Sequence, residues 1–320
     1  MQSFRTNDNV TIKYIDTGLL GGGEDLQKPL LMLIHGFTGS SAVWQRNIPS
    51  LSKEYRVIAP DLRGHGDSDK CRHGYQVMRL AKDLRELVLL FEDPEAVDSK
   101  QKLWKAVGGS LGCSILWCYA SLFTTNPFTH MVFVDQSPLQ NSDPTSGWDH
   151  RFCNRSMNNA LALSSFQTTL ALSPATAHRG TIAACLSYLA YPLPTDIQTS
   201  AERTSDEEFF LREAMKGDPW WYGKLMADHT ALDWRHAIQA SFGPGSGSTT
   251  KVLVIASTRS GCFPSAGPIT VAGLVNDGAE EKRAKRVVVH WGGHWLYWEG
   301  PERFARMCLE FFGDLEVVDA

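Results

Sequence analysis

The sequence lacks several features that would place it in familiar classes of protein. No apolar run approaches the roughly 18 residues that a membrane-spanning helix needs, and the first residues contain no apolar signal core. An excess of charge of one sign is also missing, because 31 Lys and Arg balance 35 Asp and Glu to a net charge of −4 over 320 residues. We therefore expect a cytoplasmic protein with no nucleic-acid partner and no membrane partner.

Motifs for metals, disulfides and nucleotide cofactors are missing as well. The seven cysteines are odd in number and contain no Cys-x-x-Cys pair, which is typical of reduced thiols in the cytosol. No His-Glu-x-x-His sequence occurs, so we expect no metal. The glycines at 21–23 lack the spacing of a dinucleotide-binding loop, and no Walker sequence is present. The sequence thus predicts that no cofactor is required.

What the chain does contain is a series of short apolar runs separated by longer mixed segments. This alternation is typical of parallel strands joined by helices, and the absence of polar alternation indicates helices on both faces of the sheet. Residues 9–16 do alternate and predict an antiparallel edge hairpin that closes near Gly21-Gly22-Gly23. The predicted fold class is α/β, with strands at 30–35, 55–61, 103–109, 130–135, 251–257 and 286–291.

One interval between strands is unusually long. Residues 138–250 show helical patterns without a convincing strand, and one helix there is predicted to start at a capping box formed by Ser205 and Glu208. A Gly- and Ser-rich connector, 242–250, leads back to the sheet. We interpret residues 139–232 as a helical cap inserted into a core formed by residues 1–138 and 233–320.

The strongest chemical signal is Gly108-Gly109-Ser110-Leu111-Gly112, which lies between a predicted strand and a predicted helix. A Gly-x-Ser-x-Gly sequence in this context forces the serine into a tight turn with its hydroxyl exposed, so Ser110 is the candidate nucleophile. The backbone N–H groups of Leu111 and of Phe37, after His35-Gly36, are the candidate oxyanion hole. His35 itself is interpreted as a structural residue.

A general base is expected near the end of a late strand. His294 follows the last strand in a glycine-rich loop, whereas His290 is assigned to the strand itself. The order of Ser110 followed by His294 is the one found in α/β-hydrolases, in which the acid lies between the two.

Four motifs in the sequence carry a family resemblance: Ile34-His35-Gly36-Phe37-Thr38-Gly39-Ser40, Pro60-Asp61-Leu62-Arg63-Gly64-His65-Gly66-Asp67-Ser68, Gly108-Gly109-Ser110-Leu111-Gly112, and Gly293-His294-Trp295 with Glu299 and Pro301. Together they resemble the α/β-hydrolase superfamily. The resemblance covers about residues 9–138 and 230–316 and implies a mostly parallel eight-stranded sheet flanked by helices, with a helical cap inserted after the sixth strand. The run Asp135-Gln136-Ser137-Pro138 and the block Trp220-Trp221-Tyr222 look most like uncharacterised fungal members.

The sequence departs from the family at the acid. Ser260 stands in the stretch where most members carry a carboxylate, and a serine supplies no charge to stabilise an imidazolium. Asp135, at the end of the preceding strand, is the preferred replacement. An unaided Ser110–His294 pair and a loop carboxylate such as Asp277 remain alternatives.

The sequence therefore predicts a serine hydrolase that forms an acyl-enzyme on an ester, lactone or thioester of a bulky hydrophobic acid, including secondary metabolites. A serine at position 110 argues against epoxide hydrolase and dehalogenase chemistry, which uses an aspartate there in this superfamily. Acyltransferase, cyclase, carbon–carbon hydrolase, peptidase and perhydrolase activities use the same residues, and a silent receptor is the rival from another class. The expected partner is a small hydrophobic acyl substrate, and the aromatic residues expected to contact it are Trp148, Phe210, Trp220, Trp221, Tyr222 and Trp295.

Overall fold

The structure is a computed structural model that describes residues 1–19, 24–92 and 103–319. Its centre is an eight-stranded sheet in the order β1-β2-β4-β3-β5-β6-β7-β8. The pairs β1–β2 and β2–β4 are antiparallel and the other pairs are parallel. The strands are β1 (Gln2–Arg5), β2 (Thr11–Asp16), β3 (Leu30–Ile34), β4 (Arg56–Pro60), β5 (Trp104–Gly109), β6 (Phe128–Val134), β7 (Lys251–Ser257) and β8 (Ala284–Val289).

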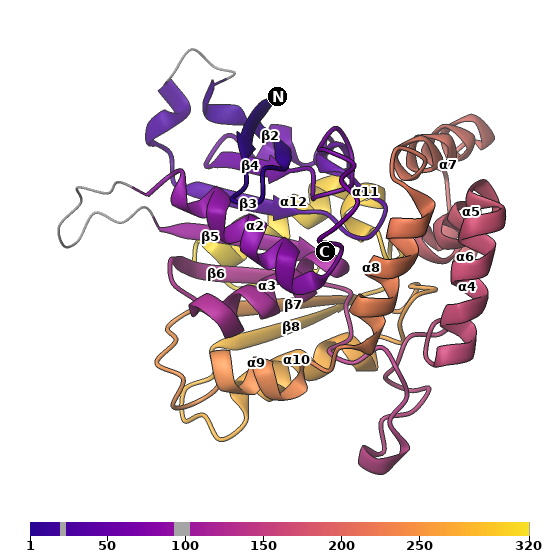
Figure 1. The fold of residues 1–320 in the computed structure, drawn as a ribbon. Helices are drawn as coiled ribbons and strands as arrows, with labels where there is room; N and C mark the ends of the chain where they lie inside the picture. The colour runs from indigo at the N-terminus through magenta and orange to yellow at the C-terminus, as the bar shows by residue number, and fades with distance from the viewer. Residues whose placement is uncertain (20–23, 93–102, 320) are drawn as a thin grey trace.

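Helices cover the sheet and also form a separate group beside one end of it (Figure 1). Their bounds are α1 (Ile48–Leu51), α2 (Val77–Leu89), α3 (Leu111–Phe123), α4 (Ala160–Leu172), α5 (Pro174–Cys185), α6 (Ser187–Ala190), α7 (Ser200–Ala214), α8 (Pro219–Ala231), α9 (Arg235–Phe242), α10 (Ala266–Asn276), α11 (Leu296–Glu299) and α12 (Pro301–Phe312). Short 3₁₀ turns lie at Thr17–Leu19, Glu24–Gln27, Ser41–Trp44 and Pro144–Ser146.

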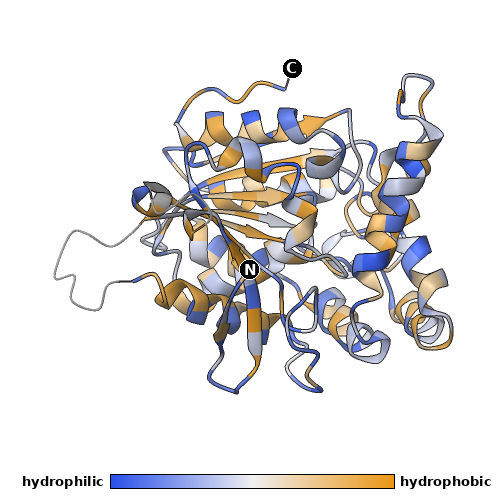
Figure 2. Cartoon of the chain, turned by 90° about the horizontal axis from the view of Figure 1, so that it is seen from above, coloured by the Kyte–Doolittle hydropathy of each residue, from blue (hydrophilic) through white to orange (hydrophobic). Residues whose placement is uncertain are grey.

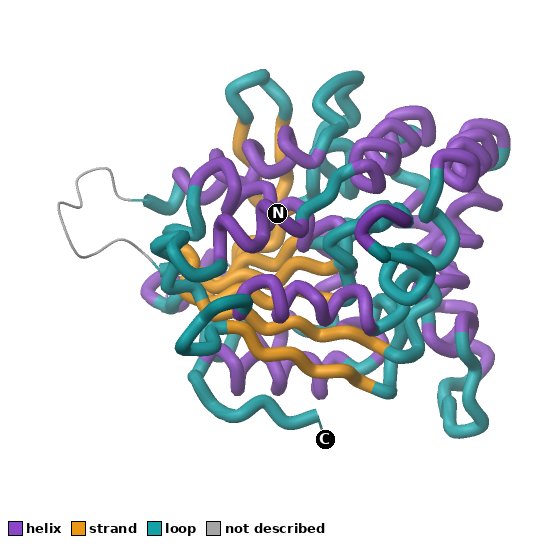
Figure 3. The backbone as a smooth tube through the Cα atoms, turned by 90° about the horizontal axis from the view of Figure 1, so that it is seen from below, coloured by secondary structure: helices purple, strands orange, loops and turns teal. Residues whose placement is uncertain are grey.

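The parallel strands are apolar on both faces because helices cover both (Figures 2 and 3). In β3, Leu30 and Met32 belong to the core shared with α2, α3, α9 and α10. The alternate residues Leu31 and Leu33 belong to the core shared with α1, α11 and α12. This arrangement explains why the strands read as continuous apolar runs without polar alternation. The predicted fold class is confirmed.

The segment between β6 and β7 contains the helices that lie apart from the sheet. Helices α4 to α8 belong to residues 139–232, which we call the inserted segment, and they lie beside the C-terminal ends of the parallel strands (Figure 1). In the part of the chain that the structure describes, each helix is too short or too polar to cross a membrane.

The edge of the sheet differs from the sequence expectation. β2 pairs on one side with β1, which precedes it, and on the other side with β4. The hairpin is therefore made with the N-terminal residues, which carry little apolar signal of their own. The turn expected near Gly21-Gly22-Gly23 lies outside the described residues.

Two local expectations were also wrong. The capping box of α7 is formed by Thr199 and Glu202, so the helix starts earlier than expected and Ser205 lies inside it. The same Ser/Thr-x-x-Glu spacing occurs at both places, and the spacing alone does not distinguish them. His290 lies just beyond β8, where it is exposed and its Nδ1 is 3.1 Å from Thr258 Oγ1.

Candidate active site

Ser110 lies on the turn between β5 and α3. Its backbone adopts φ 52° and ψ −118°, a strained conformation for a residue other than glycine. The flanking glycines permit close packing, since a Cβ at Gly108 would lie 2.6 Å from the backbone of Gly112, and one at Gly112 would lie 2.5 Å from the carbonyl oxygen of Ile34. The turn has the geometry of a nucleophile elbow. The Ser110 hydroxyl donates to Gln136 Oε1 at 3.4 Å.

The loop after β3 packs directly against this serine. A Cβ on Gly36 would lie 3.1 Å from the Cβ of Ser110, so only glycine allows this approach without a shift of the loop. Phe37, the next residue, lines the same cavity as Ser110. Leu111 is the first residue of α3, where a backbone N–H has no partner within the helix. The two positions expected to supply oxyanion donors thus flank the nucleophile.

His35 stabilises this loop. Its Nδ1 is 2.8 Å from the carbonyl oxygen of Gly36, and the backbone N–H of Leu62 donates to Nε2 at 3.0 Å. The ring is fully buried, and burial lowers its pKa. A neutral ring that donates through Nδ1 and accepts through Nε2 satisfies both contacts. This arrangement is structural.

Asp135 and His294 meet between the ends of β6 and β8. Asp135 Oδ2 is 2.7 Å from His294 Nδ1, and Asp135 Oδ1 accepts from the backbone N–H of Ser257 at 3.0 Å. The carboxyl group is fully buried, and the residue has a positive φ of 48°. Ser260 does not reach the imidazole in this way; its Oγ accepts from the backbone N–H groups of Cys262 and Phe263 and so shapes the loop after β7.

Ser110 and His294 face one small cavity of about 40 Å³ beneath the inserted segment. Its lining is mixed in polarity and includes residues that the sequence did not suggest, among them His229 and Cys262. No motif marks these two residues, because they reach the cavity from separate elements. The lining residues are Phe37, Ser110, Gln140, Asn154, Met157, Thr181, Cys185, Met226, His229, Cys262, Phe263, His294 and Trp295.

Of the six aromatic residues expected to contact substrate, Trp295 lines this cavity. Phe210 stacks on Trp295 at 3.8 Å between ring centroids and so lies behind it. Tyr222 is fully buried and packs behind Phe37 at 5.3 Å. Both therefore support the lining from behind.

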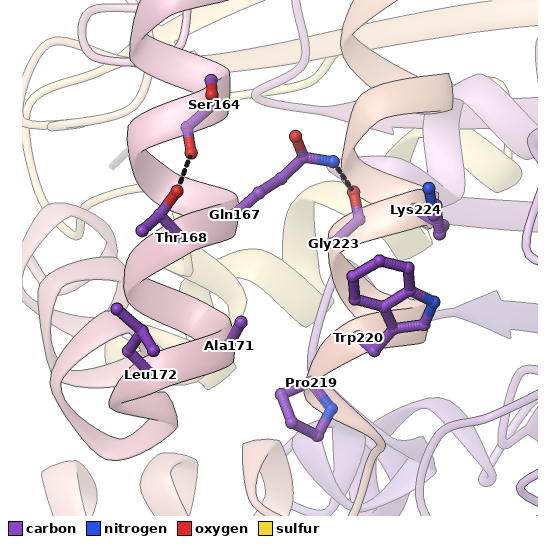
Figure 4. A pocket seen from close by; sticks show the side chains of 9 residues that line it. All are labelled: Ser164, Gln167, Thr168, Ala171, Leu172, Pro219, Trp220, Gly223 and Lys224. Atoms are coloured by element: carbon purple, nitrogen blue, oxygen red, sulfur yellow. Dashed lines mark hydrogen bonds between the residues drawn. The ribbon is translucent and has the colours of Figure 1, made fainter.

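The other three expected contact residues lie elsewhere. Trp221 stacks on Tyr75, and Trp148 stacks on Phe152 in a small separate cluster. Trp220 is 60% exposed and lines an outer groove between α4 and α8, where Gln167 Nε2 donates to the carbonyl oxygen of Gly223 at 2.8 Å (Figure 4). The structure does not bring these three side chains to the cavity at Ser110.

Burial, Cys262 and Asp135 act together on the pKa of His294. Burial opposes protonation of the imidazole, but the neighbouring Cys262 sulfur and Asp135 raise the pKa of His294. A hydrogen bond from Cys185 and the neighbouring His294 lower the pKa of Cys262, against the effect of burial. Burial and the neighbouring Cys262 raise the pKa of the Cys185 thiol. Cys262 and His294 thus shift each other's pKa in opposite directions, since each favours the charged form of the other.

Comparisons with curated proteins find similarity in short stretches. The soluble epoxide hydrolase of Corynebacterium sp. (strain C12) is 48% identical over 58 residues, which are 18% of this chain and 20% of that protein. The pimeloyl-[acyl-carrier protein] methyl ester esterase of Vibrio atlanticus (strain LGP32) is 34% identical over 114 residues, 35% of this chain and 38% of that protein. The chain thus matches well under half the length of these relatives.

The similarity of fold extends over nearly the whole chain. An esterase from Exiguobacterium antarcticum superposes with a TM-score of 0.78 at 13% identity, covering 98% of this chain and 99% of that one. Residues 29–301 match the family described as the α/β hydrolase fold. With its elbow serine and strand order, the chain belongs to the α/β-hydrolase family.

Proposed function

We propose that the chain is a serine hydrolase that cleaves esters, lactones or thioesters through an acyl-enzyme. His294 Nε2 accepts the proton of Ser110 as Ser110 Oγ attacks the carbonyl carbon, and the N–H groups of Phe37 and Leu111 stabilise the oxyanion. His294 then protonates the leaving group. Water, activated by the same imidazole, releases the acid and restores Ser110.

The contact between Asp135 and His294 carries this proposal. At 2.7 Å, Asp135 Oδ2 accepts from Nδ1–H, so we propose that the other ring nitrogen takes the proton of Ser110, which lines the same cavity. The backbone N–H of Ser257 fixes the second carboxylate oxygen and hence the orientation of the group. We propose that Asp135 fills the role that Ser260 lacks the charge to perform, and this contact favours an enzyme over a silent receptor.

The Cys262 thiol must hold a proton during this reaction. A protonated His294 has no lone pair with which to accept the Ser110 proton. We therefore propose that the pair of Cys262 and His294 reacts in its neutral form, with the proton on the sulfur and a lone pair on the imidazole.

The inserted segment is proposed to act as a cap that selects the acyl group. The cavity at Ser110 is too small for a bulky acid, but a neighbouring pocket of about 340 Å³ shares Asn154, Met157, Thr181 and Cys262 with it. The wider pocket is mostly apolar. We propose that the hydrophobic acyl chain lies there, with Trp295 beside the reacting carbonyl.

Ser110 also distinguishes this chemistry from that of the epoxide hydrolase relative. A serine forms an acyl-enzyme with a carbonyl substrate, whereas the alkyl-enzyme chemistry expected of epoxide hydrolases uses a carboxylate nucleophile at this position. The shared stretch of sequence therefore supports the fold of this chain and not epoxide opening.

A fluorophosphonate probe and a p-nitrophenyl ester series test the proposal. The wild-type protein should be labelled once and should hydrolyse the esters, while Ser110→Ala should lose both properties. Ser121→Ala, an exposed serine at the other end of α3, is the matched control and should retain both.

Three outcomes would overturn parts of the proposal. Equal labelling of Ser110→Ala would remove Ser110 from the mechanism. Hydrolysis that survives Ser110→Ala but is lost in Cys262→Ser would assign the nucleophile to Cys262. Product formed with an added alcohol in preference to the free acid would assign an acyltransferase.

A further inference from the structure

Three side chains with metal-binding atoms converge beside the cavity. Cys185 ends α5 of the inserted segment, Cys262 lies in the loop after β7, and His294 lies in the loop after β8. Their ligand atoms all lie within 4.8 Å of one another, and the two sulfur atoms are 3.6 Å apart. Cys185 is 2% exposed and His294 is 4% exposed. A cluster of three soft or borderline ligands thus lies at the boundary between core and inserted segment.

The spacing of the sulfur atoms suits a tetrahedral metal ion. Two thiolates bound to zinc at about 2.3 Å in a tetrahedral site lie about 3.8 Å apart. The observed 3.6 Å is close to that value and far from the bond length of about 2.0 Å in a disulfide. Little movement of Cys185 or Cys262 would be needed to bind an ion.

His294 is already oriented as a zinc ligand would be. Its Nδ1 is 2.7 Å from Asp135 Oδ2, so Nε2 is the ring nitrogen left to bind an ion. Metal-binding histidines commonly donate their other N–H to a carboxylate in this way, which fixes the ring and increases its basicity. Asp135 would thus orient His294 for the bound ion without binding the ion itself.

An ion can approach the cluster from the outer pocket. Cys262 lines both the pocket of about 340 Å³ and the inner cavity. The inner cavity leaves room at a fourth coordination position for water or a substrate oxygen. Two thiolates balance the charge of a divalent ion, and Zn²⁺ accepts this mixture of sulfur and nitrogen.

We propose that Cys185, Cys262 and His294 bind Zn²⁺ and that the bound ion reversibly inhibits hydrolysis. Binding releases the proton of Cys185 and the proton held by the pair of Cys262 and His294, and it occupies His294 Nε2, so the imidazole no longer accepts the proton of Ser110. The ion also links the inserted segment to the core through Cys185. The binding step stands on the ligand geometry alone, whereas the inhibition rests on the proposed function.

Binding is tested with Co²⁺, which replaces Zn²⁺ and reports on its ligands by absorption. The reduced protein should bind one Co²⁺ and gain a sulfur-to-cobalt charge-transfer band, which Zn²⁺ should remove. Cys185→Ser and Cys262→Ser should each weaken binding by more than about tenfold, because thiolates are the preferred ligands. Cys153→Ser, which removes a buried cysteine outside the cluster, should bind Co²⁺ as the wild type does.

Inhibition is tested in parallel with Zn²⁺ and EDTA. Zn²⁺ should suppress ester hydrolysis and fluorophosphonate labelling of the wild type, EDTA should restore both, and Cys185→Ser should resist Zn²⁺. Absence of the cobalt band, or equal Zn²⁺ sensitivity of Cys185→Ser, would overturn the proposal. Inactivation that dithiothreitol reverses and EDTA does not would show a disulfide instead. A cobalt band without ester hydrolysis would contradict the proposed function and leave the metal site standing.

Discussion

At the scale of single residues, Asp135 combines two features that are each uncommon. It has a positive φ, which costs free energy for a non-glycine residue, and its carboxyl group is fully buried. The backbone N–H of Ser257 and the ring of His294 compensate for the burial by hydrogen bonding to the two oxygens. We expect these costs to be tolerated because Asp135 orients the imidazole of His294.

Asp135→Asn should therefore lower kcat by a factor of about 10²–10⁴ with little change in KM, because an amide favours the wrong tautomer of His294. Steady-state hydrolysis of a p-nitrophenyl ester measures the effect. Asp277→Asn is the control, since Asp277 is an exposed carboxylate that accepts a hydrogen bond from Gln239 and should leave turnover unchanged. Near-normal turnover of Asp135→Asn would remove the residue from the mechanism.

At the scale of elements, α11 ties the loop of His294 to the inserted segment. Glu299, the last residue of α11, accepts from the backbone N–H of Gly293 at 2.6 Å, from the hydroxyl of Ser187 at 2.6 Å and from its backbone N–H at 3.0 Å. Burial raises the pKa of this carboxyl group, and the hydrogen bonds oppose that effect. The Glu299 side chain thus links the loop that carries His294, through Gly293, to the first residue of α6, Ser187.

Glu299→Ala should lower the free energy of unfolding by about 1–3 kcal/mol for each backbone N–H that is left buried without a partner. Glu299→Gln should have an intermediate effect, because its single carbonyl oxygen serves one of the two sites. Urea unfolding monitored by tryptophan fluorescence measures the loss. Glu280→Ala, an exposed loop position, should change stability by less than about 0.5 kcal/mol. An unchanged urea midpoint for Glu299→Ala would show that these hydrogen bonds of Glu299 do not stabilise the fold.

At the scale of the whole molecule, two buried histidines of the inserted segment link stability to pH. Burial lowers the pKa of His178 to about 4, and burial followed by the charge of His294 lowers the pKa of His229 to about 3. Between pH 6.5 and these values the unfolded chain binds more protons than the folded one, so stability falls as pH falls.

Between pH 6.5 and pH 5, each of these two histidines should lower the free energy of unfolding by about 1.5 kcal/mol. The reason is that its imidazole becomes protonated in the unfolded chain and stays neutral in the folded one. Urea unfolding at both pH values measures this loss. His178→Gln should reduce it, whereas His150→Gln, which alters a histidine exposed at the surface, should leave it as in the wild type. A pH dependence that is equal in all three proteins would show that His178 titrates normally.

Much of the fold could be predicted because the physical cause is local. The buried strands appear in the sequence as apolar runs. Gly108 and Gly112 mark the turn at Ser110, because a side chain at either position would clash with the backbone. The edge strand β1 could not be predicted, because an exposed four-residue strand has no apolar pattern. The start of α7 could not be predicted either, since two capping-box spacings compete and packing decides between them.

By itself the sequence determined the α/β architecture, the elbow at Ser110 and the candidacy of His294 and Asp135, because each depends on neighbours close along the chain or at the ends of adjacent strands. Only the tertiary structure decided that Cys185, Cys262 and His229 share a cavity with Ser110 and that Trp148, Trp220 and Trp221 do not. The reason is physical: these residues come from separate helices and loops, and their positions follow from how the inserted segment packs on the sheet.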